Sequence, residues 1–372
     1  MVLGLSYSVA TMASATNHPQ SVANRDRPND LLGRPLGVLR LSLTALCNLA
    51  CPYCLPDGKE PPGLLTLEQR LGVIGAAVAL GAHSLRLTGG EPLLHRGLEE
   101  LIAAVQPLRA THLERPGLGE IALTSNGLLL TAERAQQLRA AGLDRITLSL
   151  DGTTAGSVAR MAGLAGAAAG ERALAAVLAA IEHARAAGFD PARGALKLNA
   201  VIQRGANDDQ VLPLAALARE RGLELRLIEF MDVGSRNGWQ SAAVLSAAEM
   251  LEQIGSSWPL EPLGRTAHGT ASRWRYRDGG GSLAVVASVS APFCGDCNRL
   301  RVTADGIAYT CLFAAPGSGL DLKPWLQEES GAAELELAMA DLWNKRSDRY
   351  SEERNTAKPA NSARAEMAYL GG

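Results

Sequence analysis

The chain has 372 residues, of which 47% are hydrophobic, so it can bury a sizeable core as one large domain or as a barrel with an appendage. Its formal net charge of -2 gives no reason to expect a nucleic-acid surface or an anionic membrane partner. No apolar run reaches the ~18 residues that a membrane-spanning helix needs. Residues 1–33 are rich in Ser, Ala, Asn and Pro without an apolar period, so we expect a mobile leader there.

From about residue 38 to residue 231, short apolar segments alternate with longer helical patterns. The predicted strands are 38–43, 84–88, 120–125, 145–150, 195–202 and 224–230, and the predicted helices are 66–81, 97–109, 131–141, 170–187 and 208–221. Alternation of this kind indicates parallel strands joined by right-handed crossovers. Six such units predict an α/β fold, a partial (β/α)6 barrel over residues 34–235. A doubly wound open sheet is the main alternative.

Polar residues recur at every second position within these strands, which puts each set on one face of its strand. The sets are Arg40, Ser42 and Thr44; Arg86 and Thr88; Thr124 and Asn126; Thr147, Ser149 and Asp151; Lys197 and Asn199; and Arg226. Branched apolar side chains fill a complete eight-stranded barrel, so a polar face predicts an open barrel with a polar ligand in its lumen. Exposure to solvent is the alternative, which parallel sheets disfavour because both of their faces are usually covered.

After residue 231 the pattern changes to a second module, residues 236–372. A helix is predicted at about 246–254, followed by a hairpin of runs 271–277 and 282–289. Another pair of strands, 300–303 and 307–312, flanks a second turn. The tail from about residue 348 is charged and polar, and it ends in Gly371 and Gly372.

All six cysteines fall into two triplets, Cys47, Cys51 and Cys54 (the first triplet) and Cys294, Cys297 and Cys311 (the second triplet). Clustered CxxC pairs in a chain of this length argue against a disulfide framework. Three thiolates leave one position open in a zinc site or a four-iron cluster, so each triplet predicts an open metal centre. Two incomplete zinc sites remain the alternative. Free thiols in this number indicate a reducing compartment, and we expect the cytoplasm.

The first triplet follows the first strand, and the turn Gly89-Gly90-Glu91-Pro92 follows the second. Paired glycines allow the backbone to approach a ligand closely. A CxxxCxxC loop with an aromatic residue before its third cysteine, followed by a GGEP turn, resembles the radical S-adenosylmethionine superfamily. From about Arg34 onward the chain is similar to one family in it, the GTP 3′,8-cyclases. The motifs are Arg40-Leu41-Ser42-Leu43-Thr44, Ile228-Glu229-Phe230-Met231-Asp232, Cys294-x-x-Cys297-x-Arg299-Leu300-Arg301 and the Gly-Gly end.

The resemblance implies two [4Fe-4S] clusters and S-adenosyl-L-methionine as cofactors, with a C-terminal extension that carries the second cluster. The implied reaction is the first step of molybdenum cofactor biosynthesis. A 5′-deoxyadenosyl radical removes the ribose C3′ hydrogen of GTP, and C3′ then bonds to guanine C8, giving 3′,8-cyclo-7,8-dihydro-GTP. The vacant iron of the second cluster would contact the guanine.

The resemblance also assigns site residues. S-adenosylmethionine contacts fall on Tyr53, Gly90, Ser149 and Met231; GTP contacts on Arg40, Arg86, Thr124, Lys197, Arg226, Arg299 and Arg301; and catalytic support on Arg299, Arg301, Gly371 and Gly372. Cations suit a triphosphate, which would be costly to bury unpaired. Ordinary salt bridges are the alternative for each basic residue. Ser84 departs from the family, whose members often carry a basic residue there, and the loop 107–119 is longer than in many relatives.

By the same resemblance the partners are GTP, a low-potential electron donor of flavodoxin or ferredoxin type and, by pathway, cyclic pyranopterin monophosphate synthase. We expect a homodimer and neither a nucleic-acid nor a membrane partner. Two other functions stay open: a radical enzyme that modifies a peptide through auxiliary clusters, and a zinc-binding scaffold or nucleic-acid module. Near-neutral charge and 4% aromatic residues disfavour the last. The chain has no GxxxxGK[ST] run, so a P-loop GTPase is not expected.

Overall fold

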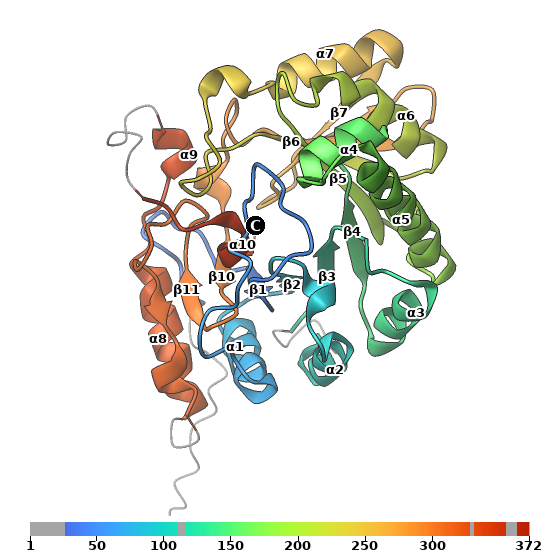
Figure 1. Ribbon diagram of the computed structural model, residues 1–372. Helices are drawn as coiled ribbons and strands as arrows, with labels where there is room; N and C mark the ends of the chain where they lie inside the picture. The colour runs from blue at the N-terminus through green and yellow to red at the C-terminus, as the bar shows by residue number, and fades with distance from the viewer. Residues whose placement is uncertain (1–26, 111–116, 328–330, 355–362, 372) are drawn as a thin grey trace, which may run out of the picture.

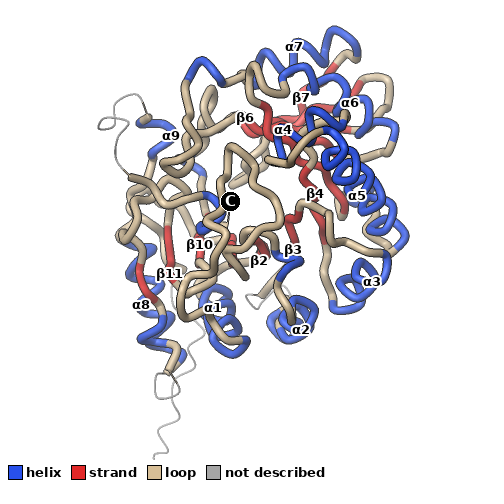
Figure 2. The backbone as a smooth tube through the Cα atoms, viewed as in Figure 1, coloured by secondary structure: helices blue, strands red, loops and turns tan. Residues whose placement is uncertain are grey.

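The computed structural model describes residues 27–110, 117–327, 331–354 and 363–371. Within these residues a 12-stranded sheet has the order β12-β11-β10-β1-β2-β3-β4-β5-β6-β9-β8-β7. Figure 1 shows the sheet curving around a central opening, with helices on its outside. Figure 2 shows the same arrangement coloured by secondary structure, with the strands inside and the helices outside. The partial barrel is therefore confirmed, and the doubly wound alternative, which places helices on both faces, is wrong.

All six predicted barrel strands are present and pair in parallel with their neighbours. They are β1 (Val38–Ser42), β2 (Ser84–Thr88), β3 (Glu120–Ser125), β4 (Arg145–Ser149), β5 (Leu196–Ile202) and β6 (Glu224–Glu229). The helices between them are α1 (Leu67–Ala79), α2 (Leu98–Ala104), α3 (Ala132–Ala141), α4 (Ala155–Ala162), α5 (Ala167–Ala186) and α6 (Val211–Glu220). Short 3-10 helices lie at Pro92–Leu94, Gln106–Leu108, Pro191–Arg193 and Asp208–Gln210.

One of these helices, α4, was not predicted. It begins after Thr154, whose side chain accepts a hydrogen bond from the Ser157 N–H, and it ends at Gly163 in a left-handed conformation. The helix has only eight residues, which is shorter than the window over which an apolar period is read from sequence. Capping and packing against α5 define the helix instead.

The C-terminal module extends the barrel sheet at both ends. Its strands are β7 (Leu260–Gly264), β8 (Ser272–Tyr276), β9 (Ser282–Val286), β10 (Arg299–Val302), β11 (Ile307–Tyr309) and β12 (Leu320–Asp321). β10 pairs in parallel with β1, and β9 pairs in parallel with β6. The two predicted hairpins are confirmed as β8–β9 and β10–β11. The module therefore shares a sheet with the barrel and places the second triplet beside the first strand.

Its helices cover the flanks. They are α7 (Ala247–Ser257), α8 (Ala332–Asn344), α9 (Tyr350–Glu353) and α10 (Met367–Leu370), with 3-10 helices at Ser241–Ala243, Cys294–Asp296 and Lys323–Trp325. The helix predicted at 246–254 is α7, which begins at a capping box of Ser246 and Glu249. α8 and β7 were not predicted. α8 packs on α1, so the C-terminal chain returns to the start of the barrel.

Alternate residues of the strands divide between two environments. Leu39, Leu41, Leu85 and Leu87 are at most 1% exposed and belong to the apolar cluster that the outer helices cover. The polar residues between them face the lumen, where Arg40, Arg86, Thr124 and Ser149 line a cavity. The period-two pattern thus has the meaning predicted from the sequence.

The start of the packed structure lies earlier than the predicted boundary at residue 34. Asn29 forms a β-bridge with Pro35, and Asp30 is buried. The rest of the predicted leader, residues 1–26, lies outside the described residues, as do residues 111–116 of the long loop. Arg109 and Leu118 form a bridge on either side of that gap.

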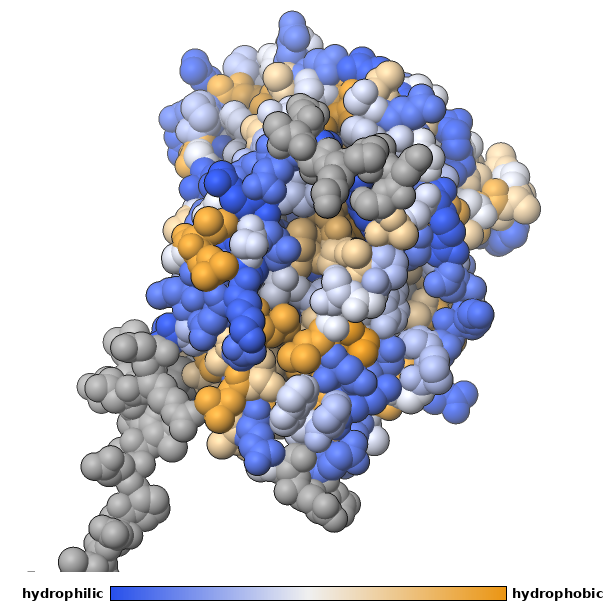
Figure 3. Space-filling view, turned by 90° about the vertical axis from the view of Figure 1, so that its left-hand side faces the viewer, coloured by the Kyte–Doolittle hydropathy of each residue, from blue (hydrophilic) through white to orange (hydrophobic). Residues whose placement is uncertain are grey.

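Among the described residues, no single helix is long and apolar enough to cross a bilayer, although the bent pair α4–α5, which turns by 94°, has the length and composition. On the face shown in Figure 3, apolar side chains occur in small patches among hydrophilic ones.

Asp232, at the end of β6, anchors the C-terminal chain to the barrel. Its carboxylate accepts hydrogen bonds from Tyr350, Arg354 and Arg364, at 3.1 Å from Arg354 and 2.9 Å from Arg364. The side chains of Asp232, Arg354 and Arg364 are 8%, 9% and 10% exposed. One nearly buried carboxylate therefore fixes the segments on both sides of residues 355–362.

We expect Asp232→Asn to destabilise the protein by about 3 kcal/mol, because it leaves two nearly buried guanidinium groups without their counter-charge. Denaturant unfolding measures the change. Asp341→Asn is the matched control, since the Asp341–Lys345 pair is exposed and its loss should cost less than about 1 kcal/mol. Equal stability of the two variants would contradict the anchoring role.

Candidate active site

The first triplet lies on the loop that leaves the carboxyl end of β1. Glu60 holds the start of this loop, because its carboxylate accepts hydrogen bonds from the Thr44 hydroxyl and, at 2.8 Å, from the Ala45 N–H. Burial raises the pKa of the Cys51 thiol well above its usual range and that of Cys54 to about 12. Thiols in this setting ionise when a metal supplies the positive charge that the protein lacks.

The GGEP turn is fixed directly against the cysteine loop. The Gly90 N–H donates to the Thr44 carbonyl and the Glu91 N–H donates to the Leu46 carbonyl, both at 2.7 Å. A Cβ atom at Gly90 would lie 2.2 Å from the Leu46 carbonyl oxygen, so no larger residue fits here. The buried Glu91 carboxylate accepts from the Ser125 hydroxyl at 2.8 Å, which ties the turn to the end of β3. The carboxyl ends of β1, β2 and β3 thus form one rigid rim.

The first triplet lines a cavity of about 160 Å³ together with this rim. A second cavity, of about 260 Å³, lies beside it. Five residues line both cavities: Tyr53, Thr124, Ser149, Asp151 and Met367. We call the connected pair the chamber. Tyr53 donates to Asp151 at 2.6 Å in its middle, and burial raises the pKa of Asp151 to about 6.

The second triplet lines the larger cavity from the other side. Cys294 begins the 3-10 helix before β10, Cys297 directly follows that helix, and Cys311 follows β11. Arg299 donates to the Cys297 sulfur at 3.1 Å. Burial opposes ionisation of Cys297, but the charges of Arg299 and Arg346 lower its pKa to about 6. Burial raises the pKa of Cys311 to about 12.

Both triplets thus face the same chamber. Within the part of the chain that the structure describes, no three His, Cys, Asp or Glu side chains are grouped to hold a single metal ion. A four-iron cluster does not require such a group, because each thiolate binds a different iron.

The larger cavity is lined by an unusual number of guanidinium groups, from Arg40, Arg86, Arg145, Arg226, Arg299, Arg301 and Arg346. Burial, followed by the charge of Arg145, lowers the pKa of Arg86 to about 9. Burial and the charge of Arg299 lower the pKa of Arg301 to about 10. Cations that repel one another in a buried site favour a polyanion as their ligand.

Two carboxylates hold part of this charge. Glu120 accepts a bidentate pair from Arg145, at 2.8 and 2.9 Å, and Ser84 donates to it as well. Glu224 pairs with Lys197 at 2.8 Å, Arg226 at 3.0 Å and Arg273 at 2.8 Å. These pairs orient the basic groups within the lumen and do not neutralise them all.

The structure gathers most of the predicted site residues around the chamber. Tyr53, Ser149, Met231, Arg40, Arg86, Thr124, Arg226, Arg299, Arg301 and the second triplet line the larger cavity, and Gly90 and the first triplet line the smaller one. Lys197 and Gly371 line neither cavity, and Lys197 lies against Glu224. Their roles toward cofactor and substrate stay predictions.

Three chamber residues were missed as site candidates. Arg145 lies two residues before Thr147, so the period-two polar face of its strand could have revealed it. Met367 and Arg346 come from the C-terminal module, and no local pattern marks them.

The C-terminal end enters the chamber. The Gly371 carbonyl accepts hydrogen bonds from Arg40 at 3.1 Å, Arg301 at 3.2 Å and Thr88 at 3.3 Å. Gly371 has φ +68°, and a Cβ there would lie 2.3 Å from the Thr88 hydroxyl oxygen. Figure 1 shows α10 lying across the barrel opening. Gly372 is outside the described residues.

Comparison with known proteins agrees with this geometry. The radical SAM superfamily matches residues 41–218, and the family described as Molybdenum Cofactor Synthesis C matches residues 223–352. The GTP 3′,8-cyclase of Synechococcus sp. strain CC9605 is 63% identical over 92% of this chain and 98% of its own length. The chain belongs to the GTP 3′,8-cyclase family. A more distant member, from Acidothermus cellulolyticus, is 41% identical with the same coverage.

Solved structures support the fold alone. Streptococcus suis SuiB bound to S-adenosylmethionine matches with a TM-score of 0.57 and 14% identity, covering 91% of this chain and 78% of SuiB. SuiB bound to its precursor peptide SuiA gives a TM-score of 0.58 at the same identity and covers 91% of this chain and 71% of SuiB. Membership of the superfamily implies S-adenosylmethionine and one [4Fe-4S] cluster as cofactors.

We expect Glu224→Gln to cost about 3 kcal/mol of stability at pH 7. Burial opposes ionisation of Glu224, but the charges of Arg226 and Lys197 lower its pKa from 4.5 to about 2, a gap worth about 1.4 kcal/mol per unit. Because the folded-state pKa lies below the unfolded one, this stabilisation is complete above about pH 4.5 and is lost as the pH falls toward 2.

Urea unfolding at a series of pH values tests this, and the variant should lose less stability on acidification than the parent chain. The control is Glu261→Gln, which removes an exposed pair with Arg275. If the stability of Glu224→Gln fell as steeply on acidification as that of the parent chain, the assignment would be contradicted.

Proposed function

We propose that the chain converts GTP to 3′,8-cyclo-7,8-dihydro-GTP, the first step of molybdenum cofactor biosynthesis. The observation that carries this proposal is the placement of two incomplete cysteine triplets around one arginine-lined chamber. One open metal centre suffices to activate a cofactor. A second, set among cations, suits an anionic substrate with a donor atom for iron.

The first triplet and the GGEP turn fit S-adenosylmethionine on a cluster. When bound, this pair supplies a 5′-deoxyadenosyl radical, which removes a hydrogen atom from the substrate. The absence of a Cβ at Gly90 leaves backbone exposed where the methionine part would approach. Tyr53 and Ser149 lie between the cysteines and the larger cavity, as contacts to the same cofactor require. Met231 lines only the larger cavity, on its substrate side.

The second triplet is proposed to hold the other [4Fe-4S] cluster. Its thiols fit an iron cluster, because there are three of them, none forms a disulfide, and all three line the same cavity. Arg299 donates to the Cys297 sulfur, which stabilises the thiolate that a cluster needs. The guanine would then lie at this wall, with Arg299 and Arg301 beside it.

The triphosphate is assigned to the basic residues at the other side of the cavity, with Arg86 and Arg226 as its contacts and Lys197 held behind them by Glu224. The desolvation cost of a buried polyanion is offset by guanidinium groups that already repel one another. Arg145 lies among them and is oriented by Glu120. Ser84 donates a hydrogen bond to Glu120, so we assign it to Glu120 and not to the phosphates.

Arg40 and Thr124 lie between these two walls, where the ribose would be. Cyclisation joins C3′ and C8 of one molecule, so a site that holds both ends of the nucleotide fixed supplies much of the rate by proximity. The ring closure also consumes one electron and one proton. We assign the electron supply to a low-potential donor of flavodoxin or ferredoxin type.

We further propose a homodimer and a downstream transfer of the product to cyclic pyranopterin monophosphate synthase. The six free cysteines favour a reducing compartment, the cytoplasm. Residues 34–235 would bind the cofactor and residues 236–372 would complete the substrate wall.

The decisive experiment is an anaerobic assay of the reconstituted chain with GTP, S-adenosylmethionine and a reductant. We expect about eight iron atoms per chain, 5′-deoxyadenosine release that depends on GTP, and a cyclised product with the mass of GTP that separates from it by chromatography, because the hydrogen atom lost from C3′ is balanced by the electron and proton gained. ATP in place of GTP is the control. Zinc in place of iron, or turnover of a peptide without GTP, would overturn the proposal.

The C-terminal glycine is assigned a catalytic role, and Gly371→Ala tests it. The added Cβ would meet the Thr88 hydroxyl at 2.3 Å and strain a positive φ, so the tail should leave the chamber. We expect cyclisation to fall at least 100-fold while iron content stays unchanged. Gly331→Ala is the control, since nothing lies within 4 Å of its Cβ position. Full activity of Gly371→Ala, or of a chain lacking residues 371–372, would refute the role.

A further inference from the structure

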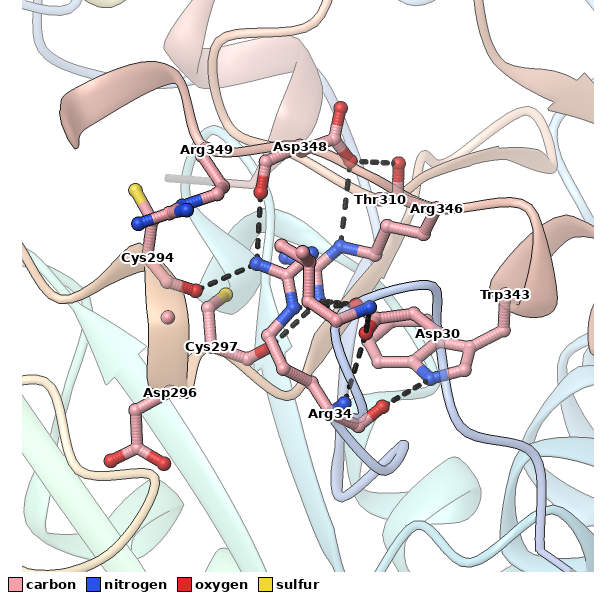
Figure 4. A network of polar contacts seen from close by, with 12 residues as sticks. Asp30, Arg34, Cys294, Asp296, Cys297, Thr310, Trp343, Arg346, Asp348 and Arg349 are labelled. Atoms are coloured by element: carbon pink, nitrogen blue, oxygen red, sulfur yellow. Dashed lines mark hydrogen bonds and ion pairs between the residues drawn. The ribbon is translucent and has the colours of Figure 1, made fainter. Parts of the chain in front are cut away.

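A group of four charged residues, three of them buried, lies beside the second triplet. We call it the charged hub: Asp30, Arg34, Arg346 and Asp348. Asp30 and Arg34 come from the start of the described chain, whereas Arg346 and Asp348 follow α8, more than 300 residues later. Figure 4 shows their side chains converging between the two segments. The side chains of Asp30, Arg34 and Arg346 are 0%, 2% and 2% exposed.

The hub contacts all three parts of the chain that carry the second triplet. Arg34 donates to the Cys294 carbonyl at 2.7 Å, and Arg346 donates to the Cys297 carbonyl at 2.6 Å. Asp348 accepts from the hydroxyl of Thr310, the residue before Cys311. The backbones of Cys294 and Cys297 and the residue before Cys311 are therefore held by the hub, while all three cysteines line the cavity.

The hub is held rigid in turn. The Asp30 carboxylate accepts from the backbone N–H groups of Leu32 and Arg34, both at 2.9 Å, and pairs with the guanidinium groups of Arg34 and Arg346. The Trp343 indole donates to the Arg34 carbonyl at 3.0 Å, and its ring lies 4.7 Å from the Arg346 guanidinium carbon. Burying the charges of Asp30, Arg34 and Arg346 is expensive, and breaking one pair leaves the others uncompensated. Such a network positions whatever it contacts.

The charges are also distributed unevenly with respect to the cysteines. The Arg346 guanidinium donates to the Cys297 carbonyl, which puts a positive charge beside that cysteine. The Asp348 carboxylate accepts from Thr310, which puts a negative charge beside Cys311. The potential of an iron–sulfur cluster depends on nearby charge and hydrogen bonds, because reduction adds a negative charge to a buried group.

We propose that Arg346 is a positioning residue of the second metal centre, which fixes the Cys297 backbone and raises the reduction potential of a cluster bound there, while Asp348 lowers it. This inference rests on the proposed second cluster. Asp30 and Arg34 keep the Arg346 guanidinium in place.

The test uses the full chain with Cys47, Cys51 and Cys54 replaced by Ser, so that only the second triplet can hold a cluster. After anaerobic reconstitution, iron content and the midpoint potential are measured by redox titration with detection of the reduced cluster by electron paramagnetic resonance. No GTP is added, so a lost substrate contact cannot change the reading. In this background we compare Arg346→Met, Arg346→Lys, Asp348→Asn and the matched control Lys345→Met, an exposed neighbour of the same charge.

We expect a more negative midpoint potential in Arg346→Met, a more positive one in Asp348→Asn, and the parent value in Lys345→Met. Arg346→Lys should restore most of the potential, since it restores the charge. An unchanged potential in both Arg346→Met and Asp348→Asn, or shifts of the same sign, would overturn the inference. If Arg346→Met loses its iron, the difference in midpoint potential between Asp348→Asn and Lys345→Met still tests the inference. A parent background without iron would instead refute the second cluster itself.

Discussion

The parallel pairing of β10 with β1 is the constraint on which the site depends. Its register sets Arg301 beside Arg40, so residues 261 positions apart in the chain share one wall of the lumen. The same pairing puts Cys294 and Cys297, which precede β10, near the start of β1, whereas the first triplet follows the carboxyl end of that strand, so the two triplets face the lumen from opposite ends of β1. Without it, the C-terminal module would be a separate hairpin domain, and the two triplets would not line one chamber. Backbone hydrogen bonds of a single strand pair thus determine where the chemistry can occur.

Much of the barrel followed from sequence pattern, because the local signals agree with the tertiary environment there. Apolar residues at alternate strand positions pack under helices, and the polar ones between them face the lumen. The prediction was weaker for short elements such as α4, since eight residues cover little more than two helical turns and give a short apolar pattern. It was also weaker for the sheet order. The sequence predicted β8–β9 and β10–β11 as hairpins but contained no signal that one would join each end of the barrel sheet.

The site divides in the same way. Cysteine spacing and strand parity identified the metal-facing and lumen-facing residues, and the structure puts nearly all of them around the chamber. Lys197 shows the limit of that reasoning, because strand parity gives the face of a residue but not its partner, and Glu224 takes its amine. Arg346 shows the other limit. It contacts Cys297, which is 49 positions away in the chain, and no pattern near Arg346 in the sequence indicates that contact.

The charged hub has a consequence for how the protein is made. It joins Asp30, among the first packed residues, to Arg346, which leaves the ribosome near the end of synthesis. The barrel strands can pair as they emerge, whereas the loop around Cys294 and Cys297 lacks its backing until the last tenth of the chain is available. On the proposed assignment of a second cluster, the pocket of the first triplet can therefore form on a growing chain, whereas the second triplet gains its support only on a nearly finished one. A chain terminated before α8 would have the cofactor pocket of the first triplet but would lack Arg346 and Asp348, which support the second triplet.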